Sequence, residues 1–247
     1  DGPRQLVFLG HIDTVAGGYQ TRAERQFMGT SADIHGTRIS FVAGNQVRWR
    51  AVDTLGPLAV NVTDFGTAVS NANVTVCPGT IPRIFDATIV WCEWTDDGDN
   101  IPEVGEGKLY KRVVSPVGAI ELLSSRLAVV RAGSLTGGGG VFQQPQITDR
   151  YVFWAETPVT GSTQLKVFTG GIANAFTSSQ VTTVSPFTDP ACGTMGFDDL
   201  TDASGPRAVF GFVRSEGLTT DVAVYDFQSN TARCVTNDMP PQAVGRI

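Results

Sequence analysis

One phrase recurs along the chain and limits the folds it can adopt: an aspartate, a short turn, and then a strand of the form aliphatic-x-aromatic. A sequence that repeats one such unit builds its core by stacking the copies on one another. The phrase occurs five times among 247 residues. The copies begin at Asp1, Asp33, Asp86, Asp149 and Asp202, and their strands cover 6–8, 39–41, 89–91, 151–153 and 208–210.

Further strands follow most copies of the phrase, with the alternating character of a sheet that has one buried face. The composition agrees, because 28 Gly, 13 Pro and only 17% charged residues suit many short strands joined by tight turns. Four short strands per repeat are what a propeller blade requires. The second strands are predicted at 47–52, 108–113, 164–168 and 221–226, and the third at 58–63, 119–123, 180–184 and 232–236.

The sequence therefore predicts an all-β fold, a β-propeller of about five four-stranded blades, in a single domain over 1–247. Residues 240–247 are expected to supply the innermost strand of the blade that begins at the N-terminus, which would close the ring. A sixth, degenerate blade is an open alternative, because 127–130 reads as an additional strand. The predicted blades are 1–27 with 240–247, 28–68, 79–125, 142–187 and 193–238.

The segment from Ser31 to Val42, with Asp33, Gly36 and then Ile39-Ser40-Phe41, resembles the S-P-D-G-x-x-I-x-F repeat of TolB-type propellers, which also occur in prolyl-oligopeptidase-like enzymes. Ala32 stands in place of the usual proline, and two residues separate Asp33 from Gly36. The resemblance implies a propeller that docks proteins or gates substrates outside the cytoplasm. It brings no catalytic residue with it.

Charge and hydropathy exclude some partners. The formal net charge is −6 and the basic residues are scattered, so the chain lacks the basic patch that a nucleic acid needs. No apolar run is long enough to cross a bilayer. We expect a secreted, extracellular or periplasmic protein, which could be part of a larger assembly or of a longer polypeptide.

The four cysteines are consistent with an oxidising compartment. Pairing Cys77 with Cys92 and Cys192 with Cys234 keeps both bridges local and is the pairing we predict. The alternative is four reduced cysteines in the core, where free cysteine is common.

One acidic loop is a candidate cofactor site, and the cofactor that it would bind is Ca²⁺. Carboxylate and amide oxygens gather around Gly98, and a hard Ca²⁺ ion prefers such ligands. The alternative is a solvated hairpin loop, because Asp, Asn and Gly are ordinary turn residues. The candidate ligands are Asp96, Asp97, Asp99, Asn100 and Glu103.

No pattern indicates a catalytic site. His11 and Asp13 resemble a zinc-ligand segment, but His35 is the only other histidine and no Glu-Glu pair exists. The repeated aspartates could meet in the central funnel, as the paired carboxylates of a five-bladed glycoside hydrolase do. Capping of the turns by local backbone bonds explains them more simply.

We therefore predict a non-catalytic binding or scaffold module that holds a protein partner on one face of the ring or in its central funnel. The long inserts at 64–80, 95–107 and 131–144 are the places where specificity would be expected. The alternative is a carbohydrate-active propeller, either a lectin-like glycan binder that uses tryptophans or a glycoside hydrolase. The tryptophans Trp91 and Trp154 are expected in the core between blades.

Overall fold

The computed structural model describes most of the chain as β-structure. The described residues are 6–15, 18–28, 30–51, 67–71, 74–130, 141–169, 180–184, 187–189, 192–214 and 220–236. They form 22 strands and contain no α-helix, which confirms the all-β prediction. In this part of the chain no helix could span a membrane.

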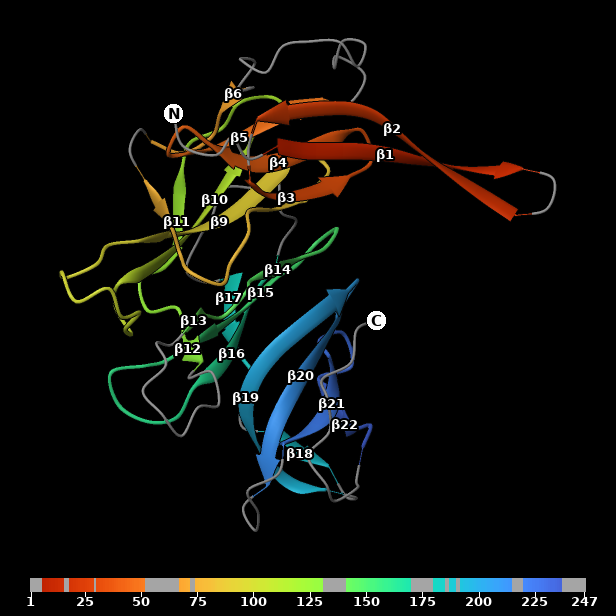
Figure 1. Cartoon of the computed structure of the whole chain (residues 1–247). Helices are drawn as coiled ribbons and strands as arrows, with labels where there is room; N and C mark the ends of the chain where they lie inside the picture. Colours follow the sequence, from red (N-terminus) through yellow and green to blue (C-terminus); the bar gives the residue numbers. More distant parts are fainter. Residues whose placement is uncertain are drawn as a thin grey trace.

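Four antiparallel sheets of four or five strands follow one another along the chain (Figure 1). In the first two sheets every strand pairs with its sequence neighbour, except that β7 and β8 share one edge of β9. The first sheet has β3 (Thr30–His35), β4 (Arg38–Ala43), β5 (Gln46–Ala51) and β6 (Thr67–Ala68); the second has β7 (Thr75–Val76), β8 (Arg83–Phe85), β9 (Thr88–Trp94), β10 (Gly107–Val113) and β11 (Glu121–Ser124).

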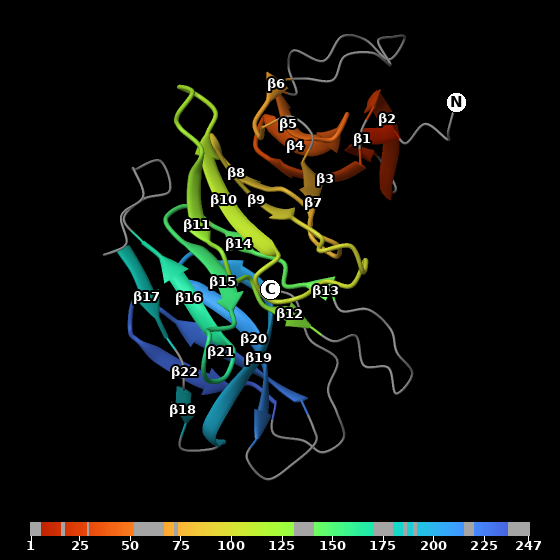
Figure 2. The same cartoon turned by 90° about the vertical axis from the view of Figure 1, so that its left-hand side faces the viewer.

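The third and fourth sheets repeat this up-and-down order, and the fourth carries one extra strand, β18, beside β19. Figure 2 shows the second, third and fourth sheets from another side, as successive layers. The third sheet has β14 (Gln146–Ile147), β15 (Val152–Glu156), β16 (Gln164–Phe168) and β17 (Val181–Thr183); the fourth has β18 (Phe187–Asp189), β19 (Gly193–Ser204), β20 (Arg207–Arg214), β21 (Thr220–Asp226) and β22 (Thr231–Cys234).

Two smaller pairings lie outside these sheets. A long ribbon of β1 (Leu6–Val15) and β2 (Gly18–Met28) projects beside the first sheet (Figure 1). The pair β12 (Val129–Val130) and β13 (Val141–Phe142) is the described part of the stretch for which a sixth blade was the alternative. The closing strand at 240–247 and the strand at 58–63 lie outside the described residues, so closure of the ring stays a prediction.

The same two-residue hairpin loop occurs once in each sheet, and it aligns the four copies. The residues that flank the loop are paired as His35 with Arg38, Phe85 with Thr88 and Ser204 with Arg207. In the third sheet the Thr148 amide bonds the Tyr151 carbonyl in the same way. Counting from this loop, the equivalent aromatic anchors are Phe41, Trp91, Trp154 and Phe210, so the anchor predicted at Phe153 lies one residue later.

The four anchors are fully buried, and Trp91, Trp154 and Phe210 each pack in a cluster with residues of the preceding sheet. Trp91 packs with Val47 and Val69 of the first sheet, and Trp154 with Val90 and Leu109 of the second. Burial of one such ring contributes about 3 to 5 kcal/mol by comparison with alanine. The core is therefore a row of seams between sheets.

Two of the anchors, both tryptophans, form the same kind of hydrogen bond to a glutamate. The indole Nε1 of Trp91 donates to Glu93 Oε1 at 2.8 Å, and that of Trp154 donates to Glu156 Oε2 at 3.3 Å. The glutamate lies two residues after the tryptophan, where a strand presents both side chains on one face. The pairing satisfies the only polar atom of each buried ring.

Both predicted disulfides are present. Cys77 pairs with Cys92 with a Cα–Cα distance of 5.3 Å, and Cys192 pairs with Cys234 at 6.2 Å. The first bridge ties the segment after β7 to β9. The second ties the turn before β19 to the end of β22, so it spans the fourth sheet from its first strands to its last.

Replacing Cys192 and Cys234 together by alanine should lower the free energy of unfolding by about 4 kcal/mol, because the bridge closes the longer loop and restricts the unfolded chain more. Replacing Cys77 and Cys92 should lower it by about 3 kcal/mol. Urea unfolding without reductant measures both variants. An unchanged stability in either variant would contradict the assigned bridge.

Candidate binding site at the ends of the innermost strands

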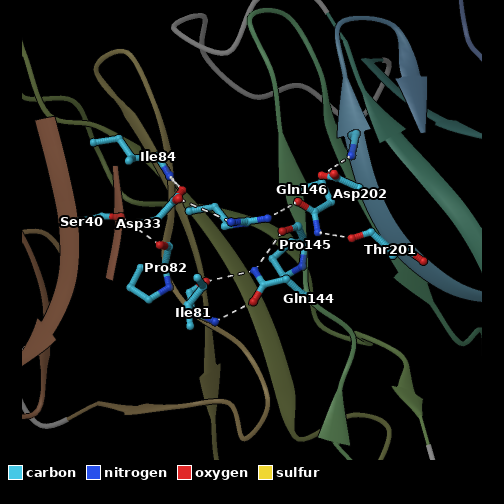
Figure 3. Close-up of polar contacts among 12 residues, drawn as sticks. Asp33, Ser40, Ile81, Pro82, Ile84, Gln144, Pro145, Gln146, Thr201 and Asp202 are labelled. Carbon is cyan, nitrogen blue, oxygen red and sulfur yellow. Dashed lines mark hydrogen bonds and ion pairs between the residues drawn. The ribbon is translucent and has the colours of Figure 1, made fainter. Parts of the chain in front are cut away.

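One cavity of about 500 Å³ lies where one strand from each of the four sheets ends. These strands, β3, β8, β14 and β19, are the innermost strands, and neighbouring ones are side by side (Figure 3). Each contributes the last residues before its hairpin loop to the wall of the cavity. The lining residues are Asp33, Ile34, His35, Arg83, Ile84, Phe85, Gln146, Ile147, Thr148, Asp149, Asp202, Ala203, Ser204 and Gly205.

Structurally equivalent positions form a polar row across these strands. The residue three places before the hairpin loop is Asp33, Arg83, Gln146 or Asp202 in successive sheets. Arg83 Nη1 lies 3.4 Å from Asp33 Oδ1, and Arg83 Nη2 donates to Gln146 Oε1 at 2.7 Å. Gln146 Nε2 in turn donates to the Thr201 carbonyl at 3.1 Å. In each of the first three sheets, one side chain of this row thus forms a hydrogen bond or an ion pair with the next sheet.

The first and second sheets are joined by bonds to the backbone edge of β8 and the segment before it. Asp33 Oδ2 accepts the Ile84 amide at 2.9 Å, and Ser40 Oγ donates to the Pro82 carbonyl at 2.9 Å (Figure 3). At the loop, His35 Nδ1 accepts the Asp86 amide at 2.9 Å. These backbone groups have no strand partner on this edge, so a side chain provides the hydrogen bond instead.

Three glutamines, two before β14 and one in it, form similar hydrogen bonds to the backbone of the second sheet and to that of the fourth sheet. Gln144 accepts the Ile81 amide at 2.7 Å and donates to the Ile81 carbonyl at 3.1 Å. Gln143 Oε1 accepts the Leu200 amide of the next sheet at 3.2 Å. Within the described chain, Gln143 Nε2 and Thr201 Oγ1 are buried without a hydrogen-bond partner. No pattern in the sequence drew attention to these glutamines, although a Gln-Gln-Pro-Gln run is visible in it.

The repeated aspartates occupy two different structural positions. Asp33 and Asp202 lie on innermost strands, whereas Asp86 and Asp149 lie in the hairpin loops. Asp202 makes a local backbone bond, because its Oδ1 accepts the Ala203 amide at 2.9 Å, but both residues lie in β19 and not in the turn. The expectation of local turn capping is wrong for Asp33, which bonds the next sheet, and for Asp86, whose carboxylate pairs with Arg38 Nη1 at 2.6 Å.

The cavity carries an excess of negative charge. Three carboxylates, Asp33, Asp149 and Asp202, and one guanidinium, Arg83, line it, which leaves two net negative charges when His35 is neutral. The ion pair with Arg83 compensates Asp33. Asp149 is exposed and lies 3.9 Å from its own neighbour Arg150, a contact that contributes little in solvent.

The predicted calcium loop lies elsewhere, between β9 and β10. Ligand oxygens of Asp96, Asp97 and Asp99 lie within 4.8 Å of one another. Backbone amides already bond these carboxylates, as at Asp99 Oδ1, which accepts the Ile101 amide at 2.7 Å. This fits both a turn held by its own side chains and a cation site, so the calcium site stays a prediction, with Asn100 and Glu103 as its other candidate ligands.

Glu106 organises the base of this loop and was not singled out in the sequence. Its carboxylate accepts the Trp94 indole N–H at 2.9 Å and the amides of Asp97 and Glu103 at 3.0 Å each. The bond from Trp94, followed by the two backbone bonds, lowers the pKa of Glu106. The carboxylate is ionised at neutral pH, where it fixes both ends of the loop.

The four tryptophans lie away from the cavity. Trp91 and Trp154 are fully buried, as predicted, and Trp49 and Trp94 are partly buried. None of them lines the cavity. The stacking platform that a glycan binder would place in the funnel is thus not built from tryptophan.

Replacing Gln144 by leucine should lower the free energy of unfolding by about 2 kcal/mol, because the Ile81 amide and carbonyl both lose their partner. The matched control is Gln228→Leu at an exposed turn position, which should change stability by less than about 0.5 kcal/mol. Chemical denaturation measures both. Equal effects of the two substitutions would show that the Gln144 bonds do not hold the second and third sheets together.

Calcium at about 5 mM should raise the melting temperature over that in EDTA, because extracellular calcium modules bind with dissociation constants of about 0.1 to 1 mM and binding stabilises the folded state. Asp96→Asn combined with Asp99→Asn should abolish the increase. A melting temperature that calcium leaves unchanged in the unsubstituted protein would identify the loop as a solvated hairpin.

Comparison with known proteins adds only distant similarities. No protein-family model matches the sequence, and no curated protein matches it significantly. Among solved structures, TolB from Acinetobacter baumannii is 12% identical with a TM-score of 0.45 over 98% of this chain and 60% of TolB. A putative TolB from Agrobacterium tumefaciens gives 12% and 0.32 over 88% and 84%, and a nidogen/laminin complex 9% and 0.36 over 80% and 58%.

The chain thus spans three fifths of the length of the first of these TolB chains. The architecture itself consists of successive antiparallel sheets of four or five strands, each with the same hairpin, and the innermost strands lie side by side at one cavity. This is the series of blade-like sheets that the repeat predicts for a β-propeller.

Proposed function

We propose that this chain is a non-catalytic binding module, secreted or periplasmic, that holds a protein partner at the cavity between its innermost strands. The cavity observed at the ends of four innermost strands is the observation that carries this proposal. A propeller frame positions such strand ends rigidly, and concave sites with a few convergent polar groups are the usual places of ligand binding. The two disulfides fit an oxidising compartment.

The chemistry of the lining favours a cationic group on the partner. Asp149 and Asp202 contribute charge from adjacent sheets, while Ile34, which is 50% exposed, offers an apolar surface for an alkyl stem. A lysine or arginine of an extended segment presents both features. The polar side chains that link the sheets are already bonded to protein, which suits a preformed binding surface.

The carbohydrate-active alternative rests on the three carboxylates in the cavity. Against it, Asp33 is bonded to Arg83 and to the Ile84 amide, which suits a structural carboxylate better than a general acid. An acid for glycoside hydrolysis needs a raised pKa in an apolar setting. The same experiment distinguishes the two functions.

The test compares the wild-type protein with an Asp149→Asn/Asp202→Asn variant in affinity capture from secreted or periplasmic extract, followed by calorimetry with each purified captured protein. We expect a protein that binds the wild type and binds the variant at least about tenfold more weakly. Asp97→Asn/Asp99→Asn, which removes the same charge elsewhere, is the control.

Oligosaccharide arrays and hydrolysis assays are run on the same proteins. Hydrolysis or glycan binding that depends on Asp149 and Asp202 would replace the proposal by the carbohydrate-active function. A captured protein that binds the Asp149→Asn/Asp202→Asn variant as tightly as the wild type would show that the binding surface lies away from the cavity.

A further inference from the structure

Two buried polar atoms lie in the seam between the third and fourth sheets. Gln143 Nε2 and Thr201 Oγ1 are shielded from solvent and, within the part of the chain that the structure describes, have no hydrogen-bond partner. Gln143 as a whole is only 2% exposed. Taking such groups out of water costs free energy that a hydrogen bond normally offsets, so two of them in one seam indicate a bound partner.

The orientation of Gln143 is fixed at its backbone and at its side chain. The Gln143 amide donates to the Ala128 carbonyl at 2.9 Å, and Oε1 accepts the Leu200 amide at 3.2 Å. A backbone N–H can bond only the oxygen of a side-chain amide, so Nε2 is the end that is left over. Turning the side-chain amide over would break the bond to Leu200. The two protons of Nε2 therefore need an acceptor at this place.

Thr201 stands at an irregularity of β19. The register with β20 shifts between Leu200 and Asp202, so Thr201 is an additional residue with none opposite it on β20. A β-bulge of this kind changes the direction in which a side chain points. The Thr201 carbonyl accepts Gln146 Nε2 at 3.1 Å, which holds the backbone of the bulge against the third sheet (Figure 3). The hydroxyl can donate one hydrogen bond and accept others.

The two unpaired groups belong to one place in the seam. Thr201 directly follows Leu200, whose amide is bonded to Gln143, yet Gln143 Nε2 and Thr201 Oγ1 do not bond each other. Apolar side chains of one core cluster pack around this stretch, among them Leu200 and Phe197. An amide donor and a hydroxyl in such surroundings suit a ligand that is very small and can both accept and donate. Water has these properties.

We propose that this seam binds one water molecule, which accepts a hydrogen bond from Gln143 Nε2 and shares a second one with Thr201 Oγ1. Buried waters have about two to four polar partners, and these two groups meet that requirement. The inference does not depend on the proposed function. It bears on the cavity of the innermost strands all the same, because Asp202, which lines that cavity, directly follows Thr201.

The first experiment replaces Thr201 by valine, which keeps the shape of the side chain and removes the hydroxyl. A hydroxyl that holds a water loses a useful hydrogen bond, so the equilibrium constant for folding should fall by about tenfold, whereas loss of an unpaired buried hydroxyl would leave it unchanged or raise it. Thr182→Val, at an exposed position of β17, is the matched control and should change it by less than about threefold. Urea unfolding measures both variants.

A double-mutant cycle with Gln143→Leu then tests whether the two groups share one ligand. If one water joins them, Thr201→Val should cost little once Gln143 has been replaced, because the water has already lost its main donor. Purely additive effects of the two substitutions would contradict a shared water. Thr201→Ser keeps the hydroxyl and should retain the stability that Thr201→Val loses.

A crystal structure of the wild-type protein, at a resolution that shows ordered water, keeps the proposal testable if a variant fails to fold. We expect a density peak within hydrogen-bond distance of both Gln143 Nε2 and Thr201 Oγ1. Two findings would overturn the proposal: a stability that Thr201→Val leaves unchanged or raises, and a crystal structure in which the two groups bond each other or another part of the protein.

Discussion

The free edge of each innermost strand is the constraint on which the arrangement of the sheets depends. The strands β3, β8 and β14 have a sheet partner on one side only, and β19 has a second partner, β18, only at Gly193–Met195. Their other amides and carbonyls would otherwise meet the crowded centre unpaired. In this protein the neighbouring sheet supplies side chains to those groups, as Asp33 does for Ile84 and Gln144 for Ile81. The bonds that satisfy one sheet therefore fix the position of the next. The same hydrogen bonds thus satisfy the backbone of one sheet and set the position of its neighbour.

The fold could be predicted from the sequence because its units repeat. The buried strands β4, β9, β15 and β20 follow from the aliphatic-x-aromatic phrase, and the disulfide pairing follows from keeping the bridges local. The copy at 151–153 was aligned one residue too early, because two aromatic residues, Phe153 and Trp154, stand next to each other at the end of the phrase. Only the register of the hairpin loop, which depends on backbone pairing, shows that Trp154 is the equivalent of Trp91.

The site was harder to predict because equivalent positions hold unlike residues. The equivalent positions of the innermost strands hold Asp33, Arg83, Gln146 and Asp202. A search for similar residue types cannot align them. A search for aspartates joined two strand positions with two loop positions instead. The glutamines of β14 and the segment before it act between sheets, and no local pattern records which backbone group lies across a seam.

The bridge between Cys192 and Cys234 has a topological consequence for the fourth sheet. It joins the turn before β19 to the end of β22, so the strands β19 to β22 lie within one covalent ring. A protease that cuts once anywhere between these cysteines leaves both fragments attached, each with its strand partners still beside it. The fourth sheet would therefore keep its pieces together after a single cut.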